Sequence, residues 1–299
     1  MKTRRLAPAY DAAVSEANEP ARGPDLSVTA LYTAQTWAWG GLEGAELLAS
    51  PEGQRVFDGT NFALAVARPF QSDARSLKHA LVHRHTLIDA LARRSDARQI
   101  LEVAAGLSRR GVAFSSDPEL SYVEVDLDHV VAHKRKLLER TEAGRAALAR
   151  PNLRLVAGDA RTLDLAPLVD TSAPLFVVAE GLLMYLPRDE QLALFERVRS
   201  LFGPAGGTFV FDLVPSAEEP KPGAAGRALG WLMRRFTRGK GFERDGRTRD
   251  DIAGDLAAAG FEIEILEPAT IAHAWSLPYP DEPTRMVVFV GRVAPARAG

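Results

Sequence analysis

The sequence predicts an α/β fold in which helices cover both faces of a mostly parallel, seven-stranded sheet. Three observations lead to this class: short apolar runs without alternation, helix-length polar stretches between them, and a glycine-containing turn after the first run. Strands that are buried on both faces of a parallel sheet have this continuous apolar character. Their alternation with helices is typical of repeated βα units.

The first third of the chain is expected to be helical. Leu81, Ile88 and Leu91 recur at helical spacing, and two arginines close the same segment, as is common in the last turn of a helix. Residues 26–95 show no strand-like alternation. We therefore expect a helical N-terminal cap over residues 1–95.

Seven short apolar segments are expected to form the sheet, and they are 99–104, 121–125, 153–157, 175–179, 207–214, 261–266 and 286–292. The first five lie within residues 96–215, which we expect to be the ligand-binding core. The last two lie within residues 261–299 and complete the sheet. One strand near the C-terminus, the last, is expected to run antiparallel to the others.

Two further segments interrupt or connect these strands. Residues 189–202 carry one apolar stripe and end at a Gly-Pro pair, which indicates a helix. Residues 216–260 break the βα rhythm with prolines and glycines, and we expect an insertion or lid followed by a helix. The basic run over residues 234–249 has three interpretations that the sequence leaves open: a solvated loop, a lid over the substrate, or a nucleic-acid contact.

The composition limits the class of partner. The chain has 37 basic and 39 acidic residues, a net charge of −2, and no cysteine. Nothing in this balance favours nucleic acid or an anionic membrane as a partner, and disulfides and thiolate metal sites are excluded. No apolar run approaches the roughly 18 residues of a spanning helix, and the N-terminus lacks the apolar core of a secretory signal. We expect a cytoplasmic protein, and the sequence leaves its oligomeric state open.

Four positions that suit ligand binding follow consecutive strands, at Gly106, Asp126, Asp159 and Glu180. Open parallel sheets bind ligands at the carboxyl ends of their strands, and glycine lets a ligand approach the backbone closely. Asp126 can accept hydrogen bonds from both ribose hydroxyls of a nucleotide, Asp159 can accept from an adenine amino group, and Glu180 can face the cleft. Each position also has a purely structural interpretation. Gly106 can allow tight packing, and Asp126 can cap a helix. Asp159 can be a turn aspartate, and Glu180 can belong to a packed turn with Tyr185 in the core.

The first turn does not fit a nicotinamide dinucleotide. That cofactor requires G-x-G-x-x-G, but Ala104 and Arg109 stand at the first and last glycine positions. Glu102 adds a negative charge before the turn, which suits a cationic ligand better than a diphosphate. A nicotinamide-dependent oxidoreductase is therefore the second interpretation.

Taken in order, these motifs resemble the leucine carboxyl methyltransferase-like family of S-adenosylmethionine-dependent O-methyltransferases, which includes tetracenomycin-type polyketide O-methyltransferases. The most specific feature is E-G-L-L-x-Y-L at residues 180–186, and the second is E-x-D-x-x-x-V-x-x-x-K beginning at Glu124. Arg84 stands five residues before Asp89, like the family's arginine that holds the cofactor carboxylate. The resemblance covers roughly residues 75–215. The family's G-x-G-x-D-T-R turn is altered here, because its Asp-Thr pair is absent.

The resemblance implies a class I methyltransferase fold with S-adenosylmethionine as the cofactor. It also implies roles for six residues. Arg84 would bind the methionine carboxylate, Glu102 and Gly106 would border the methionine part, Asp126 would bind the ribose, Asp159 the adenine, and Glu180 would line the cleft.

The expected reaction is methyl transfer to an oxygen of a small molecule, a polyketide-like phenol or a carboxylate. A carboxylate acceptor needs no base, whereas a phenol benefits from one. The candidates are Tyr185, His83 and His273, with His79 and His85 as further histidines. His79 and His83 have a spacing that suits a metal, but no third ligand is evident and we predict no metal. A non-catalytic relative that binds the cofactor stays an alternative, and the sequence leaves the acceptor and the general base open.

Overall fold

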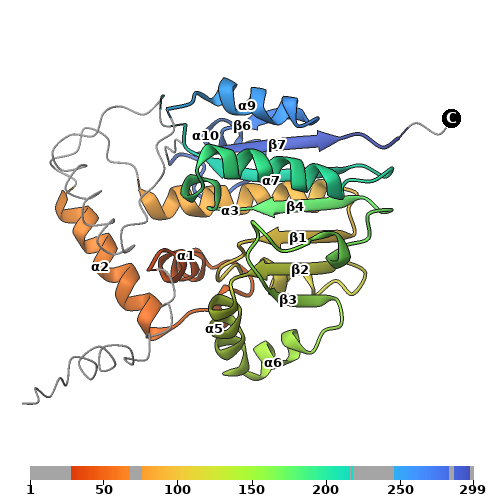
Figure 1. The fold of residues 1–299 in the computed structure, drawn as a ribbon. Coiled ribbons are helices and arrows are strands. Elements are labelled where there is room, and N and C mark those ends of the chain that lie inside the picture. Colours follow the sequence, from red (N-terminus) through yellow and green to blue (C-terminus); the bar gives the residue numbers. More distant parts are fainter. Residues whose placement is uncertain (1–27, 68–75, 216, 218–245, 283–285, 297–299) are drawn as a thin grey trace, which may run out of the picture.

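The computed structural model describes residues 28–67, 76–215, 217, 246–282 and 286–296. Seven strands in these ranges form one sheet in the order β3-β2-β1-β4-β5-β7-β6 (Figure 1). The strands are β1 Gln99–Val103, β2 Ser121–Asp126, β3 Leu153–Ala157, β4 Leu175–Ala179, β5 Gly207–Leu213, β6 Glu262–Leu266 and β7 Val287–Val293. All neighbouring pairs are parallel except those of β7, which runs antiparallel to both β5 and β6. The predicted mixed sheet, with its last strand antiparallel, is confirmed.

Both faces of the central strands β1, β4 and β5 are buried, which explains their continuous apolar runs, whereas the edge strands β3 and β6 have one face that is less buried. Successive side chains of a strand point to opposite faces, and β1 shows this directly: Ile100 lies in one core cluster and Leu101 in the other. The first cluster packs against α3 Leu77–Arg94 and α5 Asp128–Glu139. The second packs against α7 Arg188–Leu201 and α9 Arg249–Ala258. A strand buried on both sides leaves no position for a polar face, so alternation is absent from its sequence.

The N-terminal part of the described chain is helical, as the sequence predicts. α1 Val28–Trp39 packs against α2 Pro51–Ala67 and against α3. In Figure 1, α1 and α2 lie beyond the carboxyl ends of the parallel strands, while α3 runs along the sheet. The N-terminal helices therefore stand at the end of the sheet where the sequence places the ligand. The division of the chain into a cap (1–95), a core (96–215), a lid with its helix (216–260) and C-terminal strands (261–299) stays a prediction.

The other described helices are short or lie between strands. They are α4 Arg110–Phe114, α6 Glu142–Leu148 and α10 Pro268–Ile271. The helix expected over residues 189–202 is α7. The helix before β6 is α9, and a capping box fixes its start: the Thr248 side chain accepts from the Asp251 backbone, and Asp251 accepts in return from the Thr248 backbone.

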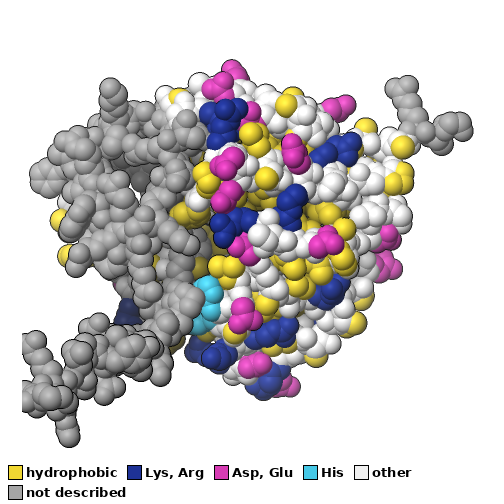
Figure 2. All heavy atoms as spheres, viewed as in Figure 1, with side chains coloured by type: hydrophobic (Ala, Val, Ile, Leu, Met, Phe, Trp, Pro, Cys, Tyr) yellow, Lys and Arg dark blue, Asp and Glu magenta, His cyan; other side chains and the backbone are white. Residues whose placement is uncertain are grey.

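The predicted lid and most of the basic run at 234–249 lie outside the described residues. Within the described part, no helix is long and apolar enough to cross a membrane. On the face shown in Figure 2, acidic and basic side chains are interspersed, without an extended patch of one sign. A basic stripe of the kind that binds nucleic acid is therefore absent from the described residues on that face.

Candidate cofactor site

Arg84 reaches from α3 to the carboxyl ends of two strands. Its Nε donates to Oε1 of Glu180 at 2.7 Å, and its Nη1 donates to Oδ2 of Asp212 at 2.8 Å. Glu180 directly follows β4, and Asp212 is the penultimate residue of β5. All three side chains are at most 5% exposed. The remaining oxygen of Asp212 accepts from the backbone N–H of Gly181 at 2.6 Å, which fixes the turn after β4.

Glu180 lies at the centre of this network. Its Oε2 accepts from Nη2 of Arg110 at 2.5 Å and lies 2.8 Å from Nδ1 of His85. Burial acts to raise the pKa of Glu180, but the charges of Arg110 and Arg84, together with the hydrogen bond to His85, outweigh it and hold this pKa well below its usual range. Glu180 is therefore ionised at neutral pH.

Both ring nitrogens of His85 are engaged within this network. Nε2 lies 3.2 Å from Nε of Arg109. Nδ1 lies 2.8 Å from Oε2 of Glu180 and 2.9 Å from Nη2 of Arg110, so a carboxylate and a guanidinium both contact it. Burial and the nearby charge of Arg110 lower the pKa of His85 well below its usual value. The ring also stacks on Trp37, with 4.1 Å between centroids. His85 is thus a neutral ring that charged neighbours hold at both nitrogens.

Arg110 joins the network to β1. Its Nε donates to Asp89 at 2.6 Å and its Nη1 donates to Glu102 at 2.7 Å. Glu102 also accepts from the hydroxyl of Tyr122 at 2.6 Å and is only 2% exposed. Arg109 makes a second ion pair with Asp89. Glu102, expected beside the methionine part of the cofactor, is therefore occupied by two protein partners.

We call these eight side chains the buried ionic cluster, and its members are Arg84, His85, Asp89, Glu102, Arg109, Arg110, Glu180 and Asp212. Three guanidinium groups face four carboxylates, so the cluster has a net charge of −1 when His85 is neutral. It lies at the carboxyl ends of β1, β4 and β5, which are neighbours in the sheet. A cationic ligand at this edge would meet a complementary charge.

The turn after β1 is tied to the end of β2. Asp126 accepts from the backbone N–H of Gly106 at 2.6 Å through one oxygen and from that of Leu127 at 2.7 Å through the other. Burial raises the pKa of Asp126, and these two N–H groups oppose the rise. Gly106 has φ +56°, and a Cβ placed on it would meet nothing within 4 Å. The open space at Gly106 argues against tight packing as the reason for this glycine.

Asp159 lies next to this turn but outside the cluster. The N–H of Gly158 donates to the carbonyl of Asp126 at 2.8 Å, which brings the ends of β2 and β3 together. The carboxylate of Asp159 is paired with Arg161 at 2.6 Å and is 28% exposed. Hydrogen bonding by Arg161 lowers the pKa of Asp159. An adenine amino group would have to share this carboxylate with Arg161.

The second family motif has a structural basis in Glu124 and Lys134. These two side chains form a buried ion pair, and the Lys134 ammonium also donates to the carbonyl of Ser108 in the first turn. Burial raises the pKa of Glu124 to about 7, against the opposing charge of Lys134. A Cβ on Gly111 would lie 2.1 Å from Glu124, so only glycine fits there. The pair therefore locks α5 and the first turn onto β2.

The three candidates for an acceptor-side residue are in different environments. Tyr185 is half-buried, hydrogen-bonds with Thr29 and lies near Arg84, and burial raises its pKa. His83 is fully buried: its Nε2 lies 2.7 Å from the carbonyl oxygen of Tyr279, while its Nδ1 has no hydrogen-bond partner. His273 is 71% exposed and pairs with Asp281 at 3.0 Å. Of the three, Tyr185 lies beside the buried ionic cluster.

The sequence did not single out Asp212 or Arg110. An aspartate within the otherwise apolar segment GTFVFDLV is a signal for a buried charge that needs a partner. Arg110 stands at the end of the altered first turn, next to Arg109, and its burial could not be inferred from local pattern. Among the described residues, no group of three or more His, Asp or Glu side chains could hold a metal ion.

Comparison with known sequences identifies the chain as an S-adenosylmethionine-dependent methyltransferase, and the seven-stranded sheet described above is its fold. Residues 43–199, more than half of the chain, match the family model described as leucine carboxyl methyltransferase, and the chain belongs to this family.

Named relatives support the same class. A "Putative S-adenosyl-L-methionine-dependent methyltransferase" of Mycolicibacterium gilvum is 29% identical over 212 residues, 67% of either chain. A protein of the same name from Mycobacterium avium is 34% identical over 110 residues, and the match spans only 35% of its length.

Two solved structures share the fold. A DUF574 family protein of Streptomyces avermitilis superimposes with a TM-score of 0.58 at 15% identity, covering 89% of this chain and 97% of its own. A "putative O-methyltransferase" of Nostoc punctiforme superimposes with a TM-score of 0.50 at 17% identity, covering 72% and 57%. At these identities the likeness concerns the fold alone.

The residues present fit S-adenosylmethionine. This cofactor carries a sulfonium, an ammonium and a carboxylate, and so has a net charge of +1. The buried ionic cluster has the opposite charge, and Gly106 leaves open space beside it. Both oxygens of Asp126 accept only one backbone hydrogen bond each from the described residues, so each keeps a lone pair for a hydroxyl.

Proposed function

We propose that this chain transfers the methyl group of S-adenosylmethionine to an oxygen of a small molecule, a polyketide-like phenol or a carboxylate. The observation that carries the proposal is the negatively charged, buried cluster beside an open, glycine-containing turn. The sulfonium supplies an activated methyl group when the cofactor is bound, and the protein supplies orientation and field. A polyketide-like acceptor would make this a cytoplasmic enzyme of secondary metabolism.

Cofactor recognition is assigned to residues on both sides of the cluster. Nε and Nη1 of Arg84 are engaged by Glu180 and Asp212, and no hydrogen bond from the described residues engages Nη2. We assign Nη2 to the methionine carboxylate, in a charge-assisted hydrogen bond. Asp126 takes the ribose hydroxyls and Asp159 the adenine amino group, while Gly106 borders the methionine part.

Glu102 and Glu180 act on the cofactor through charge. Both are buried and accept hydrogen bonds from Arg110. They therefore contribute negative potential at the carboxyl ends of the strands, while their oxygens remain hydrogen-bonded to the protein. Their proposed role is to keep the cluster negative and Arg84 in place. This is a positioning role, and it agrees with their low exposure.

The acceptor oxygen is assigned to the side of Tyr185. Because burial raises the pKa of Tyr185, its hydroxyl stays protonated at neutral pH and can donate to an acceptor oxygen. Holding that oxygen in line with the methyl group in a dry cleft supplies most of the rate. For a phenol, His83 is the candidate base, because Nε2 donates to the Tyr279 carbonyl and no hydrogen bond from the described residues engages the buried Nδ1. His273 is exposed and is the weaker candidate.

Calorimetry with Asp126→Ala tests the cofactor site. We expect S-adenosylmethionine to bind at least about tenfold more weakly, which corresponds to about 1.4 kcal/mol. Asp128→Ala is the matched control, because Asp128 is exposed and lies two residues away at the start of α5. Equal affinity for the Asp126 variant and the wild type would contradict the assignment.

An acceptor panel with detection of the demethylated cofactor tests the reaction. If phenols are methylated and the methylation rate rises with pH, the reaction uses a base. If carboxylates are methylated at a rate that does not change with pH, the acceptor needs no base. Thermal shifts with S-adenosylmethionine and with NADH, run side by side, test the oxidoreductase alternative. Cofactor binding without any methylated product across the panel would favour a non-catalytic relative.

A further inference from the structure

A cavity of about 280 Å³ lies at the opposite end of the sheet from the buried ionic cluster. Its lining residues come from five elements and two loops, and they are Leu91, Arg94, Ser95, Phe176, Thr208, Glu264, Trp275 and Arg292. Phe176 and Thr208 are the second residues of β4 and β5, so the cavity opens at the amino ends of the parallel strands. The proposed cofactor site, at the carboxyl ends, does not use any of these residues.

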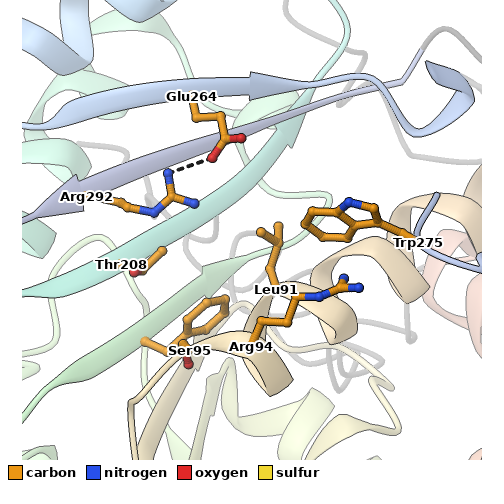
Figure 3. A pocket seen from close by; sticks show the side chains of 8 residues that line it. Leu91, Arg94, Ser95, Thr208, Glu264, Trp275 and Arg292 are labelled. Carbon is orange, nitrogen blue, oxygen red and sulfur yellow. Dashed lines mark hydrogen bonds and ion pairs between the residues drawn. The ribbon is translucent and has the colours of Figure 1, made fainter. Parts of the chain in front are cut away.

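The floor and one wall of the cavity are apolar. Leu91 and Phe176 are buried, and Trp275 is half-buried above them. Figure 3 shows Leu91 and the indole of Trp275 beside a common space, which Phe176 also lines. Aromatic rings of a ligand pack well against such surfaces, by stacking or edge contacts.

The rim of the cavity is cationic. The Arg94 guanidinium lies 3.9 Å from the centroid of the Trp275 ring and forms no ion pair with any described residue. Nη1 of Arg292 donates to Glu264 at 2.6 Å, which leaves the other guanidinium donors of Arg292 available. Two guanidinium groups and one carboxylate give the rim a net charge of +1, and the hydroxyl of Thr208 adds a neutral donor (Figure 3).

We propose that this cavity binds a small aromatic carboxylate. Guanidinium groups recognise carboxylates through charge-assisted, often bidentate hydrogen bonds, and the apolar floor accepts the ring. The volume of about 280 Å³ lies just below the range of about 300–1,000 Å³ for small-molecule pockets, so a single ring fits better than a fused polycycle. The site is separate from the proposed methyl transfer, and its test does not depend on that function.

Titration of the full chain with benzoate, followed by ¹H–¹⁵N NMR of the tryptophan indoles, tests the proposal. The Trp275 resonance is assigned with Trp275→Phe. We expect a saturable shift of this resonance below about 20 mM benzoate, a range suited to a weak small ligand. Arg94→Gln and Arg292→Gln should each weaken binding by at least about fivefold, because each removes one charge-assisted contact.

The controls separate the parts of the proposal. Arg93→Gln changes the neighbouring arginine, which lies over Phe114 and 3.8 Å from Glu43, outside the cavity, and it should bind benzoate like the wild type. Neutral benzamide should bind at least about fivefold more weakly, since it lacks the charge. The proposal is overturned if benzoate leaves Trp275 unshifted, if Arg93→Gln weakens binding as much as Arg94→Gln, or if inorganic phosphate or benzamide binds as tightly as benzoate.

Discussion

Replacing Glu180 by glutamine should destabilise the protein by about 3 kcal/mol. Both carboxylate oxygens face donors, with Nε of Arg84 2.7 Å from Oε1 and Nη2 of Arg110 2.5 Å from Oε2. In either amide orientation, the NH₂ group of glutamine would therefore point at a guanidinium group. Removing one partner of a buried ion pair costs about 3–5 kcal/mol. The lower end applies here, because Arg84 keeps Asp212 and Arg110 keeps two other carboxylates.

Urea unfolding at pH 7.5 without cofactor measures this loss, with tryptophan fluorescence and circular dichroism as probes. The slope of the unfolding free energy against urea concentration should be the same for the wild type and for Glu180→Gln. An equal slope shows that the substitution leaves the compactness of the folded and unfolded states unchanged. Glu190→Gln is the control: Glu190 lies 3.4 Å from Arg161 on the surface and should cost less than about 1 kcal/mol. A loss below about 1 kcal/mol for Glu180→Gln would refute the view that its charge holds the buried cluster together.

Three further predictions follow from the same structure. Gly181→Ala should cost about 1–2 kcal/mol in urea unfolding, because Gly181 has φ +67°, a left-handed conformation that disfavours a Cβ, although the Cβ itself would make only an ordinary contact at 3.7 Å from the Arg84 guanidinium. The lowered pKa of Glu180 gives stability that is present above its unfolded value of 4.5 and is lost as the pH falls toward its folded value. The stability difference between wild type and Glu180→Gln should therefore shrink below about pH 4.5 in melts over pH 3–7, and a constant difference would contradict this. Phe209→Ala should cost about 3–5 kcal/mol, since the ring is fully buried and lies 6.0 Å from that of Phe261; a loss near zero would show that the core collapses around the gap.

The sheet was predictable from the sequence because each strand carries its own signal. A run such as LFVVA at residues 175–179 is apolar at every position, since both of its faces are buried. The helix at α7 was equally predictable from its apolar stripe. The positions of Gly106, Asp126 and Glu180 at strand ends also followed from local pattern, because each comes directly after such a run.

The partners of these residues were not predictable in the same way. Arg84 meets Asp212 across 128 positions, and Arg110 meets Glu180 across 70. Sequence pattern indicates where a strand ends, but the choice among several arginines depends on packing between elements. Glu102 shows the consequence: its place beside the first turn was inferred correctly, yet its oxygens are bonded to Arg110 and Tyr122.

The position of β7 between β5 and β6 imposes an order on folding. The ribosome produces β6 before β7, but among the described strands β6 pairs with β7 alone, so it has no place in the sheet until β7 has been made. Until then, β5 presents an open edge of unpaired backbone groups, which is a template for association with other chains. A nascent chain that stalls before residue 287 would therefore be exposed to aggregation, although the other five strands could already be assembled.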